Sequence, residues 1–205
     1  GKYMGAVSLG VYDKAYQLMR YPLMLLTFAM TPAIQPAIRK YANDKEKIFA
    51  IHKDFTFKLS LIGASAGLMM FILSDWIVQL MLGPQWHAVI PIIQVLSISI
   101  PAQVVLSTSG SFFQAMNRSD LLFYSGLLST LILVVAISWG IYNRDMISLS
   151  WALVVSFHIN FIQAYCILHI KLFGRGLLSF FCKMLPAATV TSGMTLWYFL
   201  KQMHA

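Results

Sequence analysis

Charged residues are scarce in this 205-residue sequence and are missing altogether from long parts of it. Asp, Glu, Lys and Arg make up 11% of the residues, whereas about a quarter of the residues in a soluble globular domain are charged. None of these four types occurs between Asp75 and Arg118, within Leu121–Asn143, or within Met146–Ile170. This scarcity excludes an ordinary soluble domain, because a chain of this length could not hide so much apolar sequence in one core.

Cysteines and motifs for chemistry are also few. The two cysteines, Cys166 and Cys182, do not suggest a disulfide framework. No group of His and Cys residues has the spacing of a metal site, and no glycine-rich phosphate loop occurs. Nothing in the sequence links a serine or a histidine as nucleophile and base. We therefore predict a protein that is not an enzyme and that has neither a metal site nor a cofactor.

Long apolar segments separated by short polar joints make up most of the chain. The longest exceed the roughly 20 residues with which an α-helix crosses a hydrocarbon layer of about 30 Å, and none alternates as a half-buried strand does. We predict an all-α polytopic membrane protein with about six transmembrane helices, at residues 12–38, 57–74, 88–116, 121–142, 146–170 and 177–200. The polar joint 40–55 is expected to be a short interfacial helix or a loop, and Asp120 a helix cap.

Lys and Arg are concentrated in alternate joints, and this pattern predicts an orientation. They occur in the joint Arg39–Lys53, at Arg118, and at Lys171 and Arg175. Basic joints lie on the cytoplasmic side, so both ends of the chain are expected on the other side. All five Trp fall near the outer ends of the predicted helices, as the preference of Trp for membrane interfaces requires. The net charge of +8 is thus explained without a nucleic-acid partner, since no basic patch with interleaved aromatics occurs.

A polar stripe runs along the first apolar segment. On an ideal helix, five side chains fall within about 40° of Asp13, namely Gln17, Arg20, Thr27, Thr31 and Gln35. Ionisable residues in a membrane span generally face the bundle interior or a cavity. The stripe is either one wall of a hydrophilic pathway, with Arg20 as an anion ligand, or a set of interhelical hydrogen bonds in which Asp13 pairs with Arg20.

Polar faces recur more weakly in two other segments. The third segment carries Gln103, Ser107, Ser111 and Gln114 on one face. The fifth carries Ser156, Asn160 and Gln163 at helical spacing. Small and polar residues of this kind suit close, hydrogen-bonded packing between membrane helices, which is the favoured interpretation for both faces. The glutamines of the third segment remain candidates for the pathway.

Three strings resemble those of a known family. Leu9–Leu18 (LGVYDKAYQL), followed by Pro22, is similar to a run found in bacterial polysaccharide transporters. These are lipid-linked oligosaccharide flippases of the multidrug/oligosaccharidyl-lipid/polysaccharide flippase superfamily. Met81–Trp86 (MLGPQW) and Gln114–Arg118 (QAMNR) resemble the family strings LLGxxW and QAxGR, in the same order along the chain. The departures are Met81 where Leu is commoner, and Met-Asn-Arg where Leu-Gly-Arg is usual.

The resemblance implies a transporter of about twelve to fourteen helices in two lobes around a central cavity. Residues 1–205 would form most of the C-terminal lobe, without the N-terminal lobe. The implied function is the export of undecaprenyl-diphosphate-linked oligosaccharide across the bacterial cytoplasmic (inner) membrane by alternating access, for lipopolysaccharide or exopolysaccharide biosynthesis. Arg20 would contact the diphosphate. The expected substrate pathway comprises Asp13, Gln17, Arg20, Thr27, Thr31, Gln35, Gln103 and Gln114.

The implied partners are the lipid-linked oligosaccharide, membrane lipids, the N-terminal lobe, and the polymerase and glycosyltransferases of the same polysaccharide. Two alternatives stay open. One is a cation-coupled transporter of drugs or of lipid II from the same superfamily, although drug antiport generally requires buried acids, which these segments almost lack. The other is a non-transporting membrane subunit that scaffolds polysaccharide assembly, which would tolerate neutralisation of the polar stripe.

Overall fold

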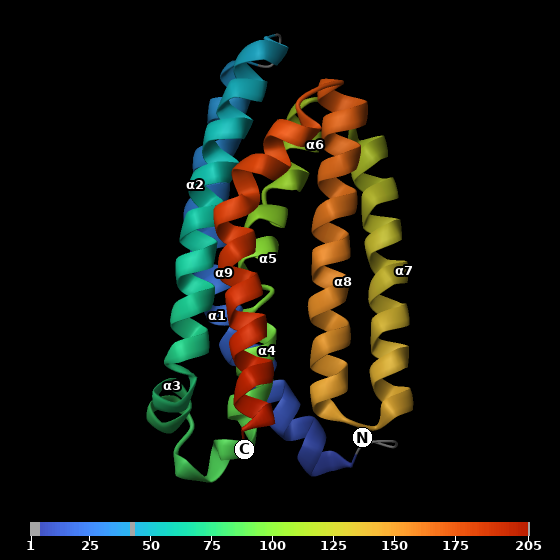
Figure 1. Cartoon of the computed structure of the whole chain (residues 1–205). Coiled ribbons are helices and arrows are strands. Elements are labelled where there is room, and N and C mark those ends of the chain that lie inside the picture. The colour runs from blue at the N-terminus through green and yellow to red at the C-terminus, as the bar shows by residue number, and fades with distance from the viewer. Residues whose placement is uncertain (1–4, 42–43, 205) are drawn as a thin grey trace.

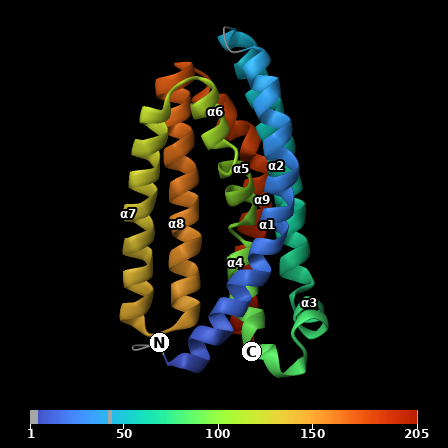
Figure 2. The same cartoon turned by 180° about the vertical axis from the view of Figure 1, so that it is seen from behind.

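The computed structural model of the chain is a bundle of long helices that run alternately up and down (Figure 1). It describes residues 5–41 and 44–204, without the side chains of residues 29–33, 35 and 39. Within these ranges every regular element is helical and no strand occurs. The two ends of the chain lie at the same end of the bundle (Figure 2), as the alternation of basic and bare joints predicted.

The first half of the chain forms a long hairpin and then turns inward. Helix α1 (Ala6–Lys40) runs from the end that carries the termini to the opposite end, and α2 (Lys45–Ile72) returns beside it. The short helix α3 (Ser74–Met81) and the 3-10 helix η1 (Pro84–Val89) then reverse the chain. They present their exposed Trp76 to the outside.

The second half contributes a broken helix, a second hairpin and a final long helix. Its elements, in chain order, are α4 (Ile90–Ser97), α5 (Ile100–Leu106), α6 (Ser109–Ala115), α7 (Ser119–Asn143), α8 (Met146–Ile167), the π-helix η2 (Leu168–Phe173) and α9 (Leu177–Met203). The three joints at which the sequence places basic residues lie between α1 and α2, between α6 and α7, and between η2 and α9. All three meet at the end opposite the termini (Figure 1).

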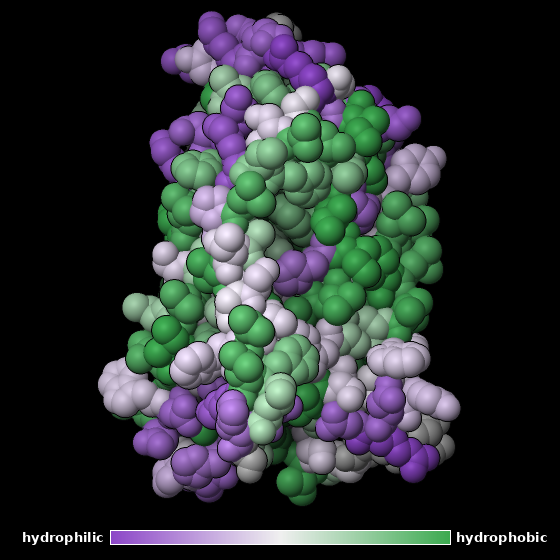
Figure 3. Space-filling view, viewed as in Figure 1, coloured by the Kyte–Doolittle hydropathy of each residue, from purple (hydrophilic) through white to green (hydrophobic). Residues whose placement is uncertain are grey.

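Within the described residues, four helices are long and apolar enough to cross a membrane. They are Lys45–Ile72, Ser119–Asn143, Met146–Phe173 and Leu177–Met203. A fifth crossing is added if the pair Pro84–Ser97 and Ile100–Ala115, bent by 54°, forms one span. Hydrophobic surface covers the middle of the molecule and hydrophilic residues gather at its two ends (Figure 3). The prediction of an all-α polytopic membrane protein is confirmed.

The predicted number of six spans exceeds these four to five. The first predicted span, residues 12–38, is helical throughout as part of α1, yet it is not among the helices that meet the criterion. Three prolines and the polar stripe lower its apolar content. Helix α1 nevertheless runs the length of the bundle beside α2 (Figure 2). It therefore differs from the other long helices in its amino-acid composition and not in its path through the bundle.

The joint between the first two long helices is shorter than predicted. Residues 45–55 are not a separate interfacial helix or a loop, because α2 already begins at Lys45. The Asp44 carboxylate accepts a hydrogen bond from the backbone N–H of Lys47 at 3.1 Å and so caps the helix. Asp120 is not the cap that the sequence suggested. It lies inside the first turn of α7 and pairs with Arg118 at 2.9 Å.

The third predicted span is broken twice, at Ile98–Ser99 and at Ser107–Thr108. Hydroxyl groups add hydrogen bonds to backbone carbonyls beside these breaks. Ser99 Oγ donates to Leu96 O at 2.7 Å and Thr108 Oγ1 to Val105 O at 2.9 Å, while Tyr165 of α8 donates its hydroxyl to the same Val105 O at 2.8 Å. A membrane helix tolerates a break only where neighbouring groups satisfy the backbone in this way.

Two glycines four residues apart let α2 approach this broken segment closely. A Cβ atom at Gly63 would lie 3.1 Å from Pro101 Cα, and one at Gly67 would lie 3.0 Å from Ser97 O. Small residues at this spacing allow the backbones of membrane helices to meet. The contact buries the break between α4 and α5 in protein, which supports its irregular backbone.

Candidate functional site

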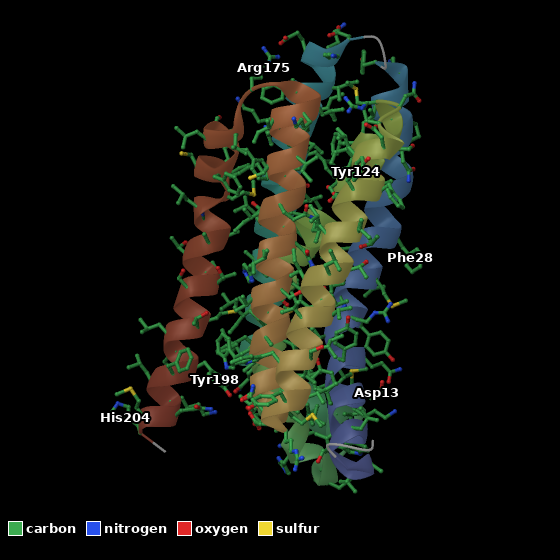
Figure 4. All side chains as sticks on the ribbon, turned by 90° about the vertical axis from the view of Figure 1, so that its right-hand side faces the viewer. Asp13, Phe28, Tyr124, Arg175, Tyr198 and His204 are labelled. Atoms are coloured by element: carbon green, nitrogen blue, oxygen red, sulfur yellow. The ribbon has the colours of Figure 1, made fainter. Side chains whose placement is uncertain are left out.

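Helix α1 has one buried face and one exposed face. Leu18 and Met19 point into the hydrophobic core and are at most 4% exposed. Asp13, Gln17 and Arg20 lie on the exposed face, and Figure 4 shows the Asp13 side chain directed away from the neighbouring helices. The predicted stripe therefore lies on the surface of the described chain rather than against its other helices.

Asp13 and Arg20 do not pair with each other. The ion pairs of the described residues join other groups, and none of them includes Asp13 or Arg20. Arg20 instead places its guanidinium carbon 6.0 Å from the centroid of the Tyr16 ring, a distance at which a cation and an aromatic face attract. Gln17 Nε2 donates to the hydroxyl of Tyr21 at 3.4 Å. The Asp13–Arg20 pair that the sequence offered as part of the alternative interpretation is thus not what the structure shows.

The remaining residues of the predicted stripe are not seen on the exposed face of α1. Thr27 is half-buried. The side chains of Thr31 and Gln35 lie outside the residues whose side chains the structure describes. Leu25 and Phe28 share the exposed side of α1, each 72% exposed, and Phe28 also points outward in Figure 4. Between Asp13 and Phe28 the exposed face of α1 thus changes from polar to apolar.

The two glutamines of the third segment do not join one site. Gln103 is half-buried on α5, where its Nε2 donates to Ser99 Oγ at 2.8 Å and lies 3.8 Å from Met19 Sδ. Since Met19 belongs to the buried face of α1, Gln103 sits behind the stripe. Gln114 is exposed on α6. Gln103 therefore serves the packing of α5 against α1, whereas the side chain of Gln114 is exposed at the surface.

A hollow of about 500 Å³ lies beside the start of the stripe. Its lining residues are Ala6, Leu9, Gly10, Tyr12, Asp13 and Tyr16. The rings of Tyr12 and Tyr16 stack with centroids 6.2 Å apart and planes inclined by 17°. Sequence reasoning did not include these tyrosines, although their spacing of four residues from each other and from Arg20 was a visible signal.

The polar face of α8 binds α7, as predicted. Gln163 Nε2 donates to Ser125 Oγ and to Ser129 Oγ, both at 3.0 Å. Ser156 and Asn160 lie on the same face and are buried, at 1% and 5% exposure. Gln163 thus joins α8 to α7 by interhelical hydrogen bonds. Ser156 Oγ and Asn160 Oδ1 have no hydrogen-bond partner within the described residues, and the face is not part of the exposed stripe.

A pair of buried histidines lies at the end of the bundle that carries the basic joints. His52 of α2 and His169 of η2 have ring centroids 5.0 Å apart. His169 Nδ1 lies 3.0 Å from the carbonyl oxygen of Arg175, and Phe112 and Phe173 flank His52 with centroids at 4.8 Å and 5.1 Å. The sequence did not single out this pair. Because aromatic rings enclose it, it packs α2 against η2 and does not contribute to the stripe.

Comparison with known proteins identifies relatives in polysaccharide biosynthesis. Residues 1–91 match the model of a family described as polysaccharide biosynthesis protein. The chain is 26% identical over 186 residues to the teichuronic acid biosynthesis protein TuaB of Bacillus subtilis (strain 168), covering 90% of this chain and 36% of TuaB. It is 27% identical over 165 residues to the lipopolysaccharide biosynthesis protein WzxC of Escherichia coli (strain K12), covering 80% of this chain and 34% of WzxC.

A third relative is the amylovoran biosynthesis protein AmsL of Erwinia amylovora, at 29% identity over 138 residues, covering 67% of this chain and 36% of AmsL. No solved structure matches the chain. The chain spans about a third of the length of these curated relatives. The matches agree with the three family strings and with the helices that are long and apolar enough to cross a membrane. The chain is thus similar to polysaccharide biosynthesis proteins, which supports the resemblance to the polysaccharide transporter family that the three strings indicated.

Proposed function

We propose that this chain acts as one lobe of a longer transporter that moves undecaprenyl-diphosphate-linked oligosaccharide across the bacterial cytoplasmic membrane. The observation that carries the proposal is the exposed polar start of α1, with Asp13, Gln17 and Arg20, on a bundle whose middle is otherwise apolar. Such a face is unfavourable in lipid, so it is best explained as the wall of a water-filled cavity closed by the other lobe.

The chemistry of the substrate suits this face. A diphosphate carries negative charge that needs a cation in a low-dielectric surrounding, and the planar guanidinium of Arg20 can donate two parallel hydrogen bonds to phosphate oxygens. The amide of Gln17 and the carboxylate of Asp13 provide donors and acceptors for sugar hydroxyls. The lipid tail meanwhile stays in the hydrocarbon beside the bundle.

The broken segment α4–α6 supports the same assignment. It packs beside α1, as the contact between Gln103 and Met19 shows, and it is bent by 54° between its two parts. Discontinuous helices in transporters generally border the substrate site, and rocking of one lobe against the other alternates access to that site. Residues at such breaks are therefore suited to movement between inward-open and outward-open states.

The proposed partners follow from the substrate. Glycosyltransferases must build the lipid-linked oligosaccharide on the cytoplasmic side, and a polymerase must consume it on the other side. The protein itself breaks no bond in the oligosaccharide, so it acts as a transporter rather than as an enzyme. The basic joints gathered at one end of the bundle (Figure 1) would then face the cytoplasm and its anionic lipids.

The test uses the full-length gene in a bacterium that lacks its own polysaccharide flippase. The amount of lipid-linked oligosaccharide that reaches the outer leaflet is measured for the wild type, Arg20→Ala and Lys14→Ala at matched expression. We expect Arg20→Ala to lower transport about tenfold or more, because a charge-assisted hydrogen bond contributes about 1.5–3 kcal/mol. Lys14→Ala is the control, since Lys14 is a cation on the same helix about 100° away from Asp13.

Unchanged transport by well-expressed Arg20→Ala and Gln17→Ala would show that α1 does not line the pathway. A non-transporting scaffold subunit would give that result together with normal polysaccharide assembly. A cation-coupled drug transporter would fail to move the oligosaccharide even as wild type, and would instead confer drug resistance.

A further inference from the structure

Tyr12, Tyr16 and Arg20 form a ladder along one side of α1. The two rings stack with centroids 6.2 Å apart, and the Arg20 guanidinium carbon lies 6.0 Å from the Tyr16 centroid. Four residues of an α-helix advance by about 6 Å, so the three side chains follow one another at an even step. The ladder therefore places a cation at one end and a pair of aromatic rings next to it.

The hollow beside this ladder has room for a ligand of moderate size. Its volume of about 500 Å³ lies within the range of about 300–1,000 Å³ that is typical of ligand pockets. Gly10 keeps it open, because a Cβ atom added there would have no other atom within 4 Å. The exposed carboxylate of Asp13 lies on its border. Two partly buried aromatic rings and one exposed carboxylate thus border the same concave surface.

The Tyr12 hydroxyl adds a second indication of a ligand. This oxygen is buried and has no hydrogen-bond partner within the described part of the chain. A buried hydroxyl without a partner lowers stability by about 1–3 kcal/mol, and the Tyr12 side chain that carries it lines the hollow. A ligand that carries hydroxyl groups fits this requirement.

We propose that the hollow binds the sugar ring that is attached directly to the diphosphate held by Arg20. A pyranose ring has an apolar face of C–H groups and a rim of hydroxyls. The tyrosine rings suit the apolar face, and Asp13 and the Tyr12 hydroxyl suit the rim. This inference rests on the proposed function, because the diphosphate at Arg20 determines which sugar lies on Tyr16 and Tyr12.

The experiment measures equilibrium binding of two probes to the purified full-length protein by isothermal titration calorimetry. Farnesyl diphosphate carries the diphosphate alone, and farnesyl-diphosphate-glucose adds one sugar ring. The wild type is expected to bind the glucose probe about three- to tenfold more tightly, the range that one aromatic contact typically supplies. Gly10→Leu should abolish this advantage by filling the hollow and should change the Kd of farnesyl diphosphate by less than about twofold.

The matched control is Gly126→Leu. Gly126 is exposed on α7 and, like Gly10, has no atom within 4 Å of an added Cβ, so the glucose advantage should persist there. Tyr12→Phe keeps the ring, removes the hydroxyl, and should retain only part of the advantage. An undiminished advantage in Gly10→Leu would overturn the sugar site and leave the proposed function standing, provided that Arg20→Ala weakens both probes. Failure of the wild type to bind either probe would overturn both proposals.

Discussion

Asp145 shows how much a single side chain decides in the short joints of this protein. Its carboxylate accepts a hydrogen bond from the backbone N–H of Ser148 at 2.7 Å and thereby caps α8. Burial raises the pKa of Asp145, but hydrogen bonds from Ser148 and from the first backbone N–H groups of α8 outweigh burial and hold the pKa below its usual value. The ionised form is therefore the one that stabilises the start of the helix.

We predict that Asp145→Ala lowers the stability of the full-length protein by about 1 kcal/mol near neutral pH. A carboxyl whose pKa is lowered by folding contributes stability above its unfolded pKa of about 3.9, and this contribution is lost as the pH falls through the folded value. The difference in Tm between wild type and Asp145→Ala should thus shrink below about pH 4, while the difference between Asp145→Asn, an uncharged cap, and Asp145→Ala should not change with pH. A difference between wild type and Asp145→Ala that does not depend on pH would mean that the charge of Asp145 is irrelevant to the cap.

At the scale of the elements, the α7–α8 hairpin depends on the close approach of its two helices at Gly140. A Cβ atom at Gly140 would lie 2.7 Å from Leu149 Cα and equally close to its Cβ, distances that two packed helices cannot accept. Gly126 lies on the same helix α7 but faces open space, with no atom within 4 Å of an added Cβ. The two glycines therefore separate the effect of helix contact from that of helix propensity.

We predict opposite effects for alanine at these two positions. Gly140→Ala should lower the free energy of unfolding by about 1–3 kcal/mol, because the helices must move apart or strain. Gly126→Ala should be neutral or should stabilise by up to about 1 kcal/mol, since alanine is the better helix former. Thermal unfolding of both variants in detergent, measured by circular dichroism, checks this. Equal Tm values would contradict the close contact between Gly140 and Leu149.

At the scale of the whole molecule, the exposed start of α1 creates a conflict. Asp13, Gln17 and Arg20 lie on the surface of the described chain, where lipid would surround them if no other lobe covered them. Polar groups without water or partners are costly in hydrocarbon. The same face that suits a transport pathway is therefore a liability for residues 1–205 in isolation.

We predict that residues 1–205 alone are unstable and polydisperse in detergent. The variant Asp13→Leu, Gln17→Leu and Arg20→Leu should improve the monodispersity of this fragment in size-exclusion chromatography, because it gives α1 a lipid-compatible face. The same three substitutions in the full-length protein should abolish transport. A stable, monodisperse wild-type fragment that gains nothing from the triple variant would show that the polar face needs no cover.

Hydropathy and the positions of Lys and Arg were sufficient to predict a helical membrane protein with both ends on one side, because lipid compatibility and helix length are properties of local sequence. The polar stripe of α1 followed from helical periodicity alone. Helix α7 begins and ends within two residues of its predicted bounds. The early start of α2 was missed, since its first turns are charged and only the Asp44 cap marks the boundary.

Packing between distant segments decided the rest. The hydrogen bond from Tyr165 to Val105 spans 60 positions, and no pattern within the third segment shows that it will be broken there and held by α8. The glycine contacts of α2 and the separation of Gln103 from the stripe likewise depend on which helices become neighbours. The direction of the stripe, outward rather than into the described bundle, was settled in the same way, because Leu18 and Met19 on the opposite side of α1 are the residues that the core buries.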